Sequence, residues 1–530
     1  MNIRGGVVLS SLILWAVVWE VTGMAAEPIG VVTSPSGNIE FTVSLESGRL
    51  SYQVFAVDGD TKVPIIGDSP LGLTLEDEDF ADGLSFVHAT SQRTIHEQYT
   101  MTTGKRSECV VVANRRIFRF RNAEGTLFDI EVHASDDGVA FRYAIPESAD
   151  KATRVSREET GFRIPKGAKA WIAPCSEYSK WTPAYEEFYT NGTPAGENAP
   201  GEPGWTFPAL FHVPGGWWCL ITESGTDGTY CGCRLAARVE DGLYRIRFPA
   251  PEEGWGQGDV EPSIDLPWKS PWRVFIIGAE PSVIVESTLV TDLAPPSQVA
   301  ETSWIKPGRV SWSWWSDHDS PQDFHKLQAF VDLAAEMGWE YSLVDANWTL
   351  MNGGNVRELA RYAQSKGVRL LLWYNSGGEH NIVTEKPRGA MKSREVRLFE
   401  FDLLREWGVA GVKIDFFQSD KQNIIRLYHD ILQDAAEKHI LVNFHGCTIP
   451  RGWQRTWPHL MSMEAVKGAE CYTFAADFPA NAPVHNTILP FTRNAIGSMD
   501  YTPVAFSDER YPHITTNAHE LALSVVFESG

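Results

Sequence analysis

The chain has 530 residues, 43% of them hydrophobic, and its 46 Lys and Arg against 68 Asp and Glu give a net charge of −22. This length and apolar content exclude a disordered chain and fit roughly two to four domains. The negative charge argues against nucleic acid and anionic membrane surfaces as partners, because both repel an acidic protein. The chain also has 20 Trp, 15 Tyr and 26 Phe, which supply core residues and flat faces of the kind that stack on sugar rings.

Residues 1–26 are predicted to be a signal peptide. A short positive start ending at Arg4 precedes the apolar run from Gly6 to Trp19, and small residues follow up to Ala26. This order is typical of a secretory signal with its cleavage site. The run is too short for a comfortable transmembrane span, and no similar run follows, so no membrane insertion is expected. We therefore expect an exported protein, periplasmic or secreted.

The cysteines do not predict a disulfide framework or a zinc site. Their odd number leaves at least one unpaired, and no CxxC pair occurs. Cys231 and Cys233 are too close for an ordinary mutual bridge, so buried thiols are expected. The seven are Cys109, Cys175, Cys219, Cys231, Cys233, Cys447 and Cys471.

Residues 27–297 are predicted to form an N-terminal β-sandwich domain. Short alternating patterns, such as Ile39, Phe41 and Val43, recur between turn-rich stretches. Period-2 patterns separated in this way are typical of large antiparallel sandwiches. Residues 293–297 are interpreted as a linker.

Residues 298–530 change to alternating strands and helices. Near-continuous apolar runs of this kind, at this spacing, predict parallel strands in a (β/α)8 TIM-type barrel. A doubly wound sheet is the competing topology, but the chain lacks the Gly-rich phosphate loop usual there. The chain stops before an eighth strand, so an incomplete barrel from a longer protein is expected. The expected strands are 310–315, 341–348, 369–375, 411–417, 440–445, 459–466 and 498–503, and the expected helices are 321–337, 356–364, 394–407 and 424–437.

Polar residues lie at or near the ends of these strands, where barrel enzymes carry their chemistry. Asp415 ends an apolar strand, and Glu464 and Glu470 lie where the sixth strand gives way to a loop. Such acids can hold a cation, shift each other's pKa or face solvent. Glycoside cleavage needs one carboxyl group protonated and another ionised. The full set is Asp317, Asp345, Asn375, Asp415, His445, Glu464 and Asp500.

Five stretches taken together resemble glycoside hydrolase family 97. They are residues 183–189, 310–315, 411–417, 442–446 and 463–470, and they span both predicted domains. The resemblance implies an N-terminal β-super-sandwich, a (β/α)8 barrel and a small C-terminal β-domain. The last of these has no counterpart among the 530 residues.

Within this family, the residues resemble the retaining branch. His445 is followed by Gly446 rather than by the base glutamate of inverting members, and the acid at the end of the fourth strand is present as Asp415. The resemblance implies that Asp415 is the nucleophile and Glu470 the acid/base of a double displacement.

The resemblance also implies a calcium ion beside the catalytic acid. The ligands would be Glu186 from the sandwich domain, Glu464 and Glu470, and carboxylate oxygens suit such a hard cation. Glu187 stays open as an alternative to Glu186, because a slip of one residue would exchange them.

Four further residues are expected to bind substrate. His445 and Asp345 are candidate partners for sugar hydroxyl groups, and Trp312 is a candidate stacking platform. Lys413 is placed to neutralise or orient Asp415, or is merely structural.

The sequence therefore predicts a calcium-dependent, retaining, exo-acting α-galactosidase that removes terminal α-galactosyl residues from oligosaccharides or polysaccharides. Another α-glycosidase, for glucose or for β-L-arabinose-like sugars, is the first alternative. A non-catalytic carbohydrate-binding protein is the second, although Asp415 and Glu470 count against it. A structural fragment is the third. A monomer is favoured.

Overall fold

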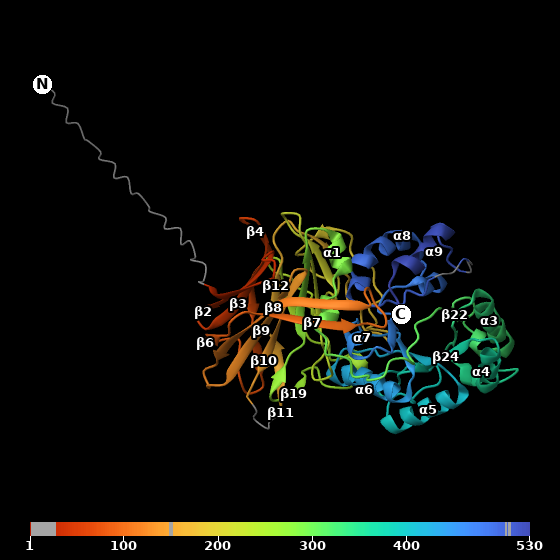
Figure 1. Cartoon of the computed structure of the whole chain (residues 1–530). Coiled ribbons are helices and arrows are strands. Elements are labelled where there is room, and N and C mark those ends of the chain that lie inside the picture. Colours follow the sequence, from red (N-terminus) through yellow and green to blue (C-terminus); the bar gives the residue numbers. More distant parts are fainter. Residues whose placement is uncertain (2–27, 148–151, 504–505, 507–509) are drawn as a thin grey trace.

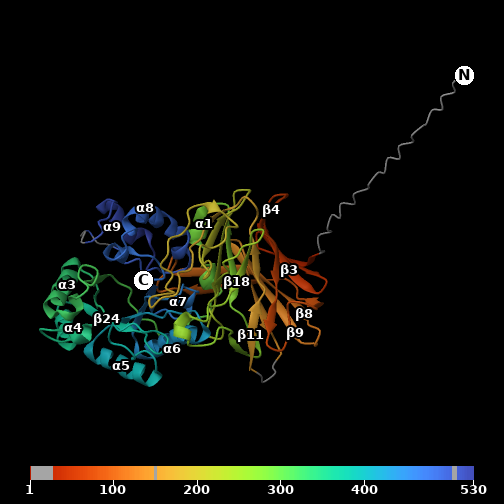
Figure 2. The same cartoon turned by 180° about the vertical axis from the view of Figure 1, so that it is seen from behind.

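A computed structural model describes residue 1 and residues 28–147, 152–503, 506 and 510–530. Apart from residue 1, the predicted signal peptide lies outside these residues. The described chain has a strand-rich half and a half of mixed helices and strands, and they lie side by side in opposite views (Figures 1 and 2). The change between them falls between β21 (Trp272–Gly278) and β22 (Val310–Trp312).

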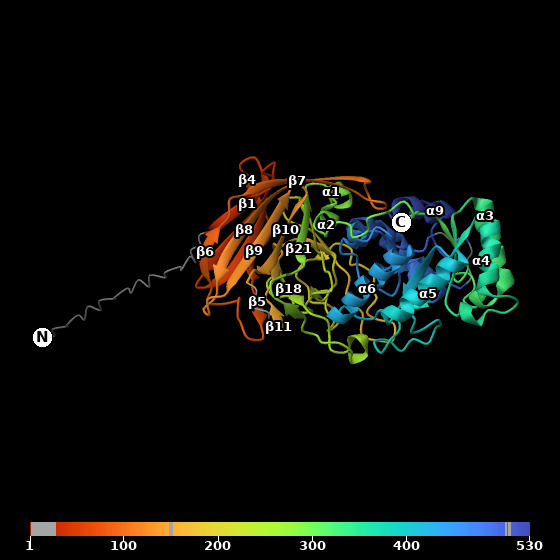
Figure 3. The same cartoon turned by 60° about the horizontal axis from the view of Figure 1, so that its bottom comes forward.

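Two large antiparallel sheets of the described residues form the strand-rich half (Figure 3). One sheet has the order β1 (Pro28–Thr33), β2 (Ile39–Glu46), β3 (Arg49–Asp58), β4 (Thr61–Leu71), β12 (Gly161–Arg163), β18 (Leu243–Arg247) and β17 (Arg234–Leu235). The other has the order β14 (Thr193–Pro194), β13 (Lys169–Trp171), β15 (Ala209–His212), β16 (Trp218–Ser224), β21, β10 (Gly138–Ile145), β9 (Leu127–Ser135), β8 (Glu108–Arg121) and β6 (Ser85–Ala89), with β7 (Arg93–Thr100) on β8 and β20 (Trp268–Lys269) on β10. A small third sheet joins β19 (Ser263–Asp265), β11 (Ala152–Glu158) and β5 (Leu73–Leu75).

Aromatic side chains from both large sheets meet in the core of the sandwich. Phe41 on β2 stacks on Tyr52 on β3, with ring centroids 5.2 Å apart. Tyr52 in turn contacts Phe141 on β10 and Phe275 on β21, at 5.1 and 5.9 Å. All four are buried, as expected for the inward positions of alternating strands. The predicted antiparallel β-sandwich is therefore confirmed.

The second half contains one six-stranded parallel sheet whose strands follow chain order, again among the described residues. Helices connect successive strands and cover the outer face of the sheet, as α3 to α6 show in Figure 3. The strands are β22, β23 (Tyr341–Val344), β24 (Arg369–Asn375), β25 (Gly411–Asp415), β26 (Leu441–Phe444) and β27 (Leu460–Met463). The helices are α3 (Phe324–Met337), α4 (Val356–Ser365), α5 (Arg394–Trp407), α6 (Gln422–Lys438) and α7 (Trp453–Thr456), with α8 (Phe478–Ile488) and α9 (Asn517–Val526) after the sheet.

Local capping explains why the connecting helices begin and end where they do. The side chain of Asp323 accepts hydrogen bonds from the backbone of His325 and Lys326 at the start of α3. Gly338 and Gly408 end α3 and α5 in the left-handed conformation, which glycine adopts at little cost. The predicted helix 394–407 and strand 369–375 match α5 and β24.

The predicted seventh strand, 498–503, is wrong. Its pairing with β27 is a single parallel bridge between Met463 and Met499. The chain then turns, because the backbone NH of Tyr501 bonds to the carbonyl of Met499 and Thr502 has a positive φ of 55°. The described residues thus form a half-barrel-like sheet rather than seven strands of a barrel.

Side-chain hydrogen bonds join the two halves. Arg451, after β26, donates to Glu223 on β16 over 2.6 Å. Lys105, between β7 and β8, donates to the carbonyls of Ser287 and Ala495.

All seven cysteines are buried and free, as expected. Among the described residues, no helix is long and apolar enough to cross a membrane.

Candidate active site

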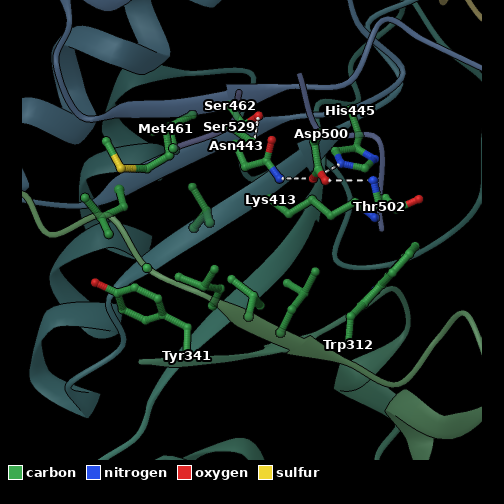
Figure 4. A pocket seen from close by; sticks show the side chains of 18 of the residues that line it. Trp312, Tyr341, Lys413, Asn443, His445, Met461, Ser462, Asp500, Thr502 and Ser529 are labelled. Carbon is green, nitrogen blue, oxygen red and sulfur yellow. Dashed lines mark hydrogen bonds and ion pairs between the residues drawn. The ribbon is translucent and has the colours of Figure 1, made fainter. Parts of the chain in front are cut away.

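The register of the parallel sheet gathers the polar side chains at one end. Trp373, Lys413 and Asn443 are paired neighbours on β24, β25 and β26. Side chains two residues apart on a strand point to the same face, so Asp415 shares the face of Lys413. Lys413, Asn443, His445 and Asp500 are among the residues that line a cavity of about 150 Å³. Figure 4 shows these side chains from close by.

Asp415 is buried at the end of β25, only 8% exposed. Burial raises the pKa of its carboxyl group to about 6, against the opposing effects of Lys413, His445 and a hydrogen bond from Trp373. The indole Nε1 of Trp373 donates that bond to Asp415 Oδ2 over 3.1 Å. Asp415 therefore ionises near neutral pH, and the indole of Trp373 on the neighbouring strand β24 orients its Oδ2 atom.

Lys413 contacts two of the predicted substrate-binding residues, Asp345 and Trp312. Its Nζ lies 2.9 Å from Asp345 Oδ2 and 4.5 Å from the ring centroid of Trp312. Trp312 Nε1 donates to the same Asp345 oxygen over 2.7 Å. Burial alone would lower the pKa of Lys413, but Asp345 and Asp415 outweigh it and raise the pKa. The ring of Trp312 also stacks on Trp314, so protein groups already contact it.

His445 lies between two carboxylates. Its Nδ1 is 3.2 Å from Glu464 Oε1, and its Nε2 is 2.7 Å from Asp500 Oδ2. Burial alone would lower the pKa of His445, but Glu464 and Asp500 outweigh it and hold the pKa well above its usual range. The contact of Nε2 with Asp500 is a hydrogen bond, whereas Nδ1 and Glu464 are close enough for an ion pair. Asn443 donates to the same oxygen of Asp500 over 2.7 Å.

Glu470 and Glu186 complete an acidic cluster around Glu464. Burial and the charge of Glu464 raise the pKa of Glu470 to about 8. Burial, Glu464, Glu470 and Asp415 raise the pKa of Glu186 well above its usual range. Glu187 instead accepts a bond from Ser176 over 2.8 Å. The segment from the sandwich half therefore presents Glu186, not Glu187, to the cluster.

The cluster fits a hard cation. Ligand atoms of His445, Glu464 and Glu470 lie within 4.8 Å of one another, and Glu186 adds a third glutamate, whose pKa is raised by burial and by the charges of Glu464 and Glu470. Carboxylate oxygens are calcium ligands, whereas a protonated His445 would serve as a hydrogen-bond donor beside the ion. A cation here would relieve the mutual repulsion of the three glutamates.

The structure adds Trp373 and Asn443 to the predicted residues, and the period-2 pattern of β24 and β26 could have identified both. Asp500, one of the predicted strand-end residues, contacts His445, whereas two others of that set serve elsewhere. Asp317 instead pairs with Lys326 at the surface, and Asn375 bonds to the backbone of the loop that follows β24.

Comparison with known proteins identifies the family. Residues 32–296 match the model of the glycosyl hydrolase 97 N-terminal domain, and residues 304–466 match that of glycoside hydrolase 97. A "Probable retaining alpha-galactosidase" from Streptomyces bingchenggensis is 35% identical over 97% of this chain and 74% of its own length.

Solved structures agree with the fold. A β-arabinopyranosidase is 33% identical with a TM-score of 0.89, over 94% of this chain and 81% of that one. A family 97 enzyme from Pseudoalteromonas sp. strain K8, solved with panose, is 23% identical with a TM-score of 0.81, over 94% and 79%. The resemblance seen in the sequence is confirmed: the chain belongs to glycoside hydrolase family 97 and is a glycoside hydrolase.

Proposed function

We propose that this enzyme is a retaining, exo-acting α-galactosidase that depends on calcium. The observation that carries the proposal is the carboxyl group of Asp415, which is buried at the end of β25, bonded to Trp373 and close to the acidic cluster of Glu464 and Glu470. In the metal-free protein, burial raises the pKa of Asp415 to about 6, and burial with the charge of Glu464 raises that of Glu470 to about 8, so the two carboxyl groups titrate separately, as a glycosidase requires. The similarity to a protein named as a probable retaining α-galactosidase supports the choice of mechanism and sugar.

In the proposed double displacement, Asp415 attacks the anomeric carbon of the bound sugar while Glu470 protonates the leaving glycosidic oxygen. A covalent glycosyl-enzyme forms as the glycosidic bond breaks. Glu470, now ionised, takes a proton from water, which attacks the same carbon and releases Asp415. The bond from Trp373 Nε1 and the charge of Lys413 favour the ionised form of Asp415 when it leaves.

Glu186, Glu464 and Glu470 are the proposed calcium ligands. A bound calcium ion supplies positive charge that stabilises ionised carboxylates in a buried site. The backbone NH of Gly446 donates to Glu464 Oε2 over 2.8 Å, which fixes one carboxylate of the set. Asp345, Trp312, Lys413 and His445 are proposed to bind the sugar, with Asp345 and His445 offering polar atoms to its hydroxyl groups.

A β-L-arabinopyranoside is the second candidate substrate, because a β-arabinopyranosidase is 33% identical to this chain. β-L-Arabinopyranose shares the ring hydroxyl geometry of α-D-galactose and lacks its hydroxymethyl group. Discrimination would therefore depend on contacts to that one group. We also propose that the enzyme is exported and acts as a monomer on oligosaccharides or polysaccharides outside the cytoplasm.

The test is hydrolysis of the p-nitrophenyl α-galactoside, β-L-arabinopyranoside and α-glucoside, with the wild type and Asp415→Gly. We expect the highest kcat/KM on the α-galactoside. The variant should lose turnover and regain it with azide, which replaces the missing carboxylate and yields a glycosyl azide. A preference for another sugar would overturn the substrate, and a folded variant without rescue would overturn the nucleophile.

A further inference from the structure

The segment that carries Glu186 reaches the acidic cluster from the sandwich half in a strained conformation. Tyr185 has a positive φ of 64°. This region of φ is unfavourable for a residue with a Cβ atom, because the side chain approaches the backbone. Strain of this kind persists only where surrounding contacts hold it. The direction of the Glu186 side chain therefore depends on what fixes Tyr185.

Asp420 fixes Tyr185. The Tyr185 hydroxyl donates a short hydrogen bond to Asp420 Oδ2, and burial keeps the pKa of this phenol well above its usual value, so it retains the proton. Asp420 is only 1% exposed, and its other oxygen, Oδ1, accepts a short bond from the hydroxyl of Thr448. Both carboxylate oxygens thus accept hydrogen bonds from hydroxyl groups.

The backbone of Asp420 is held as firmly as its side chain. Its NH donates to Glu253 Oε2 over 2.9 Å, and its carbonyl accepts from the NH of Gly232 over 2.9 Å. The guanidinium groups of Arg234 and Arg451 lie 3.8 and 3.7 Å from its carboxylate oxygens. These charges keep a fully buried carboxylate compensated, as burial requires.

Asp420 connects the three segments that bring acids and His445 to the site. It lies five residues after Asp415, Thr448 lies three after His445, and Tyr185 directly precedes Glu186. We propose that Asp420 and Tyr185 are positioning residues, whose hydrogen bond aims Glu186 into the acidic cluster and so sets the affinity of the calcium site. This inference rests on the proposed role of Glu186 as a calcium ligand.

The test is calcium binding to the metal-free full chain, measured by isothermal titration calorimetry. Tyr185→Phe removes only the hydroxyl group that bonds to Asp420. The loss of a residue that orients a metal ligand typically weakens binding about 10- to 100-fold, so we expect a dissociation constant raised by about that factor. At saturating calcium, kcat should return to within about twofold of the wild type, since the variant still reaches the bound arrangement.

Tyr189→Phe is the matched control, because Tyr189 lies in the same segment and is bonded through its hydroxyl to Thr492 rather than to Asp420. We expect its calcium affinity to match the wild type. Without calcium, the two variants should have the same Tm in thermal unfolding. Equal Tm values would show that a change in calcium affinity is not caused by a general loss of stability.

Equal affinity in Tyr185→Phe and the wild type would overturn the positioning role while leaving the calcium site intact. Equal weakening in both variants would overturn it too, because packing of the segment would then be the cause. A wild type that binds no calcium would instead overturn the metal assignment itself.

Discussion

Replacing Trp373 by Phe tests how the nucleophile is tuned. The change keeps an aromatic ring against Phe416, whose centroid is 5.8 Å away, and removes the Nε1 donor that lies 3.1 Å from Asp415 Oδ2. A hydrogen bond to the ionised form lowers a pKa, so its loss must raise the pKa of Asp415. Hydrogen bonds to charged groups contribute about 1.5 kcal/mol or more, which corresponds to about one pKa unit.

The pKa of Asp415 would then rise from about 6 to about 7. At pH 6 the ionised fraction would fall from about one half to about one eleventh, so kcat/KM should fall about fivefold. At pH 8 both forms are almost fully ionised, and the two enzymes should agree within about 10% apart from any change in packing. The acidic limb of the kcat/KM profile should therefore move to higher pH.

Trp453→Phe is the control for this experiment. Trp453 is also buried, and its Nε1 donates to the carbonyl of Thr226 rather than to a site carboxylate. Its acidic limb should match that of the wild type. An unmoved acidic limb in a folded Trp373→Phe enzyme, or a limb moved to lower pH, would refute the assignment of this limb to Asp415.

Three further predictions concern the charges of the site. Exhaustive chelation should abolish hydrolysis and added calcium should restore it; full activity after chelation would exclude the ion. Glu470→Gln should lower kcat/KM about 10²- to 10⁴-fold on alkyl galactosides, and far less on dinitrophenyl galactoside, whose leaving group needs no proton. Lys413→Met should leave Asp345 as an uncompensated buried charge and cost about 3–5 kcal/mol in urea unfolding. A stability equal to the wild type would mean that the pair of Lys413 and Asp345 contributes nothing.

The strands of the half-barrel were predictable because buried parallel strands are continuous apolar runs. The residues at which these strands end were less predictable. The strand predicted over 411–417 ends at Asp415, since Phe416 turns the chain with a φ of 70°. The segment after Ser498 has the composition of a strand, yet its chain turns at Tyr501. Apolar content indicates burial, whereas the turns depend on tertiary contacts.

The site likewise contains residues that the strand pattern predicts and residues that only tertiary contacts bring in. Asp415 and Lys413 lie on β25, and His445 directly follows the neighbouring strand β26, so their proximity could be expected from the pattern. Glu186 comes from the other half of the chain, and no periodicity indicates that Glu186 rather than Glu187 meets Glu464. The contact of Asp500 with His445 likewise depends on the turn after Met499, which strand periodicity does not predict.

The proposed double displacement requires that Asp415 forms a covalent bond to the sugar. Proton NMR of α-galactoside hydrolysis tests it most directly, by following the anomeric signals in the first minutes before mutarotation mixes them. Two displacements at one carbon restore its configuration, so we expect galactose to appear first as the α-anomer. Initial release of the β-anomer would contradict it, because a single displacement by water would then leave Asp415 no role as nucleophile.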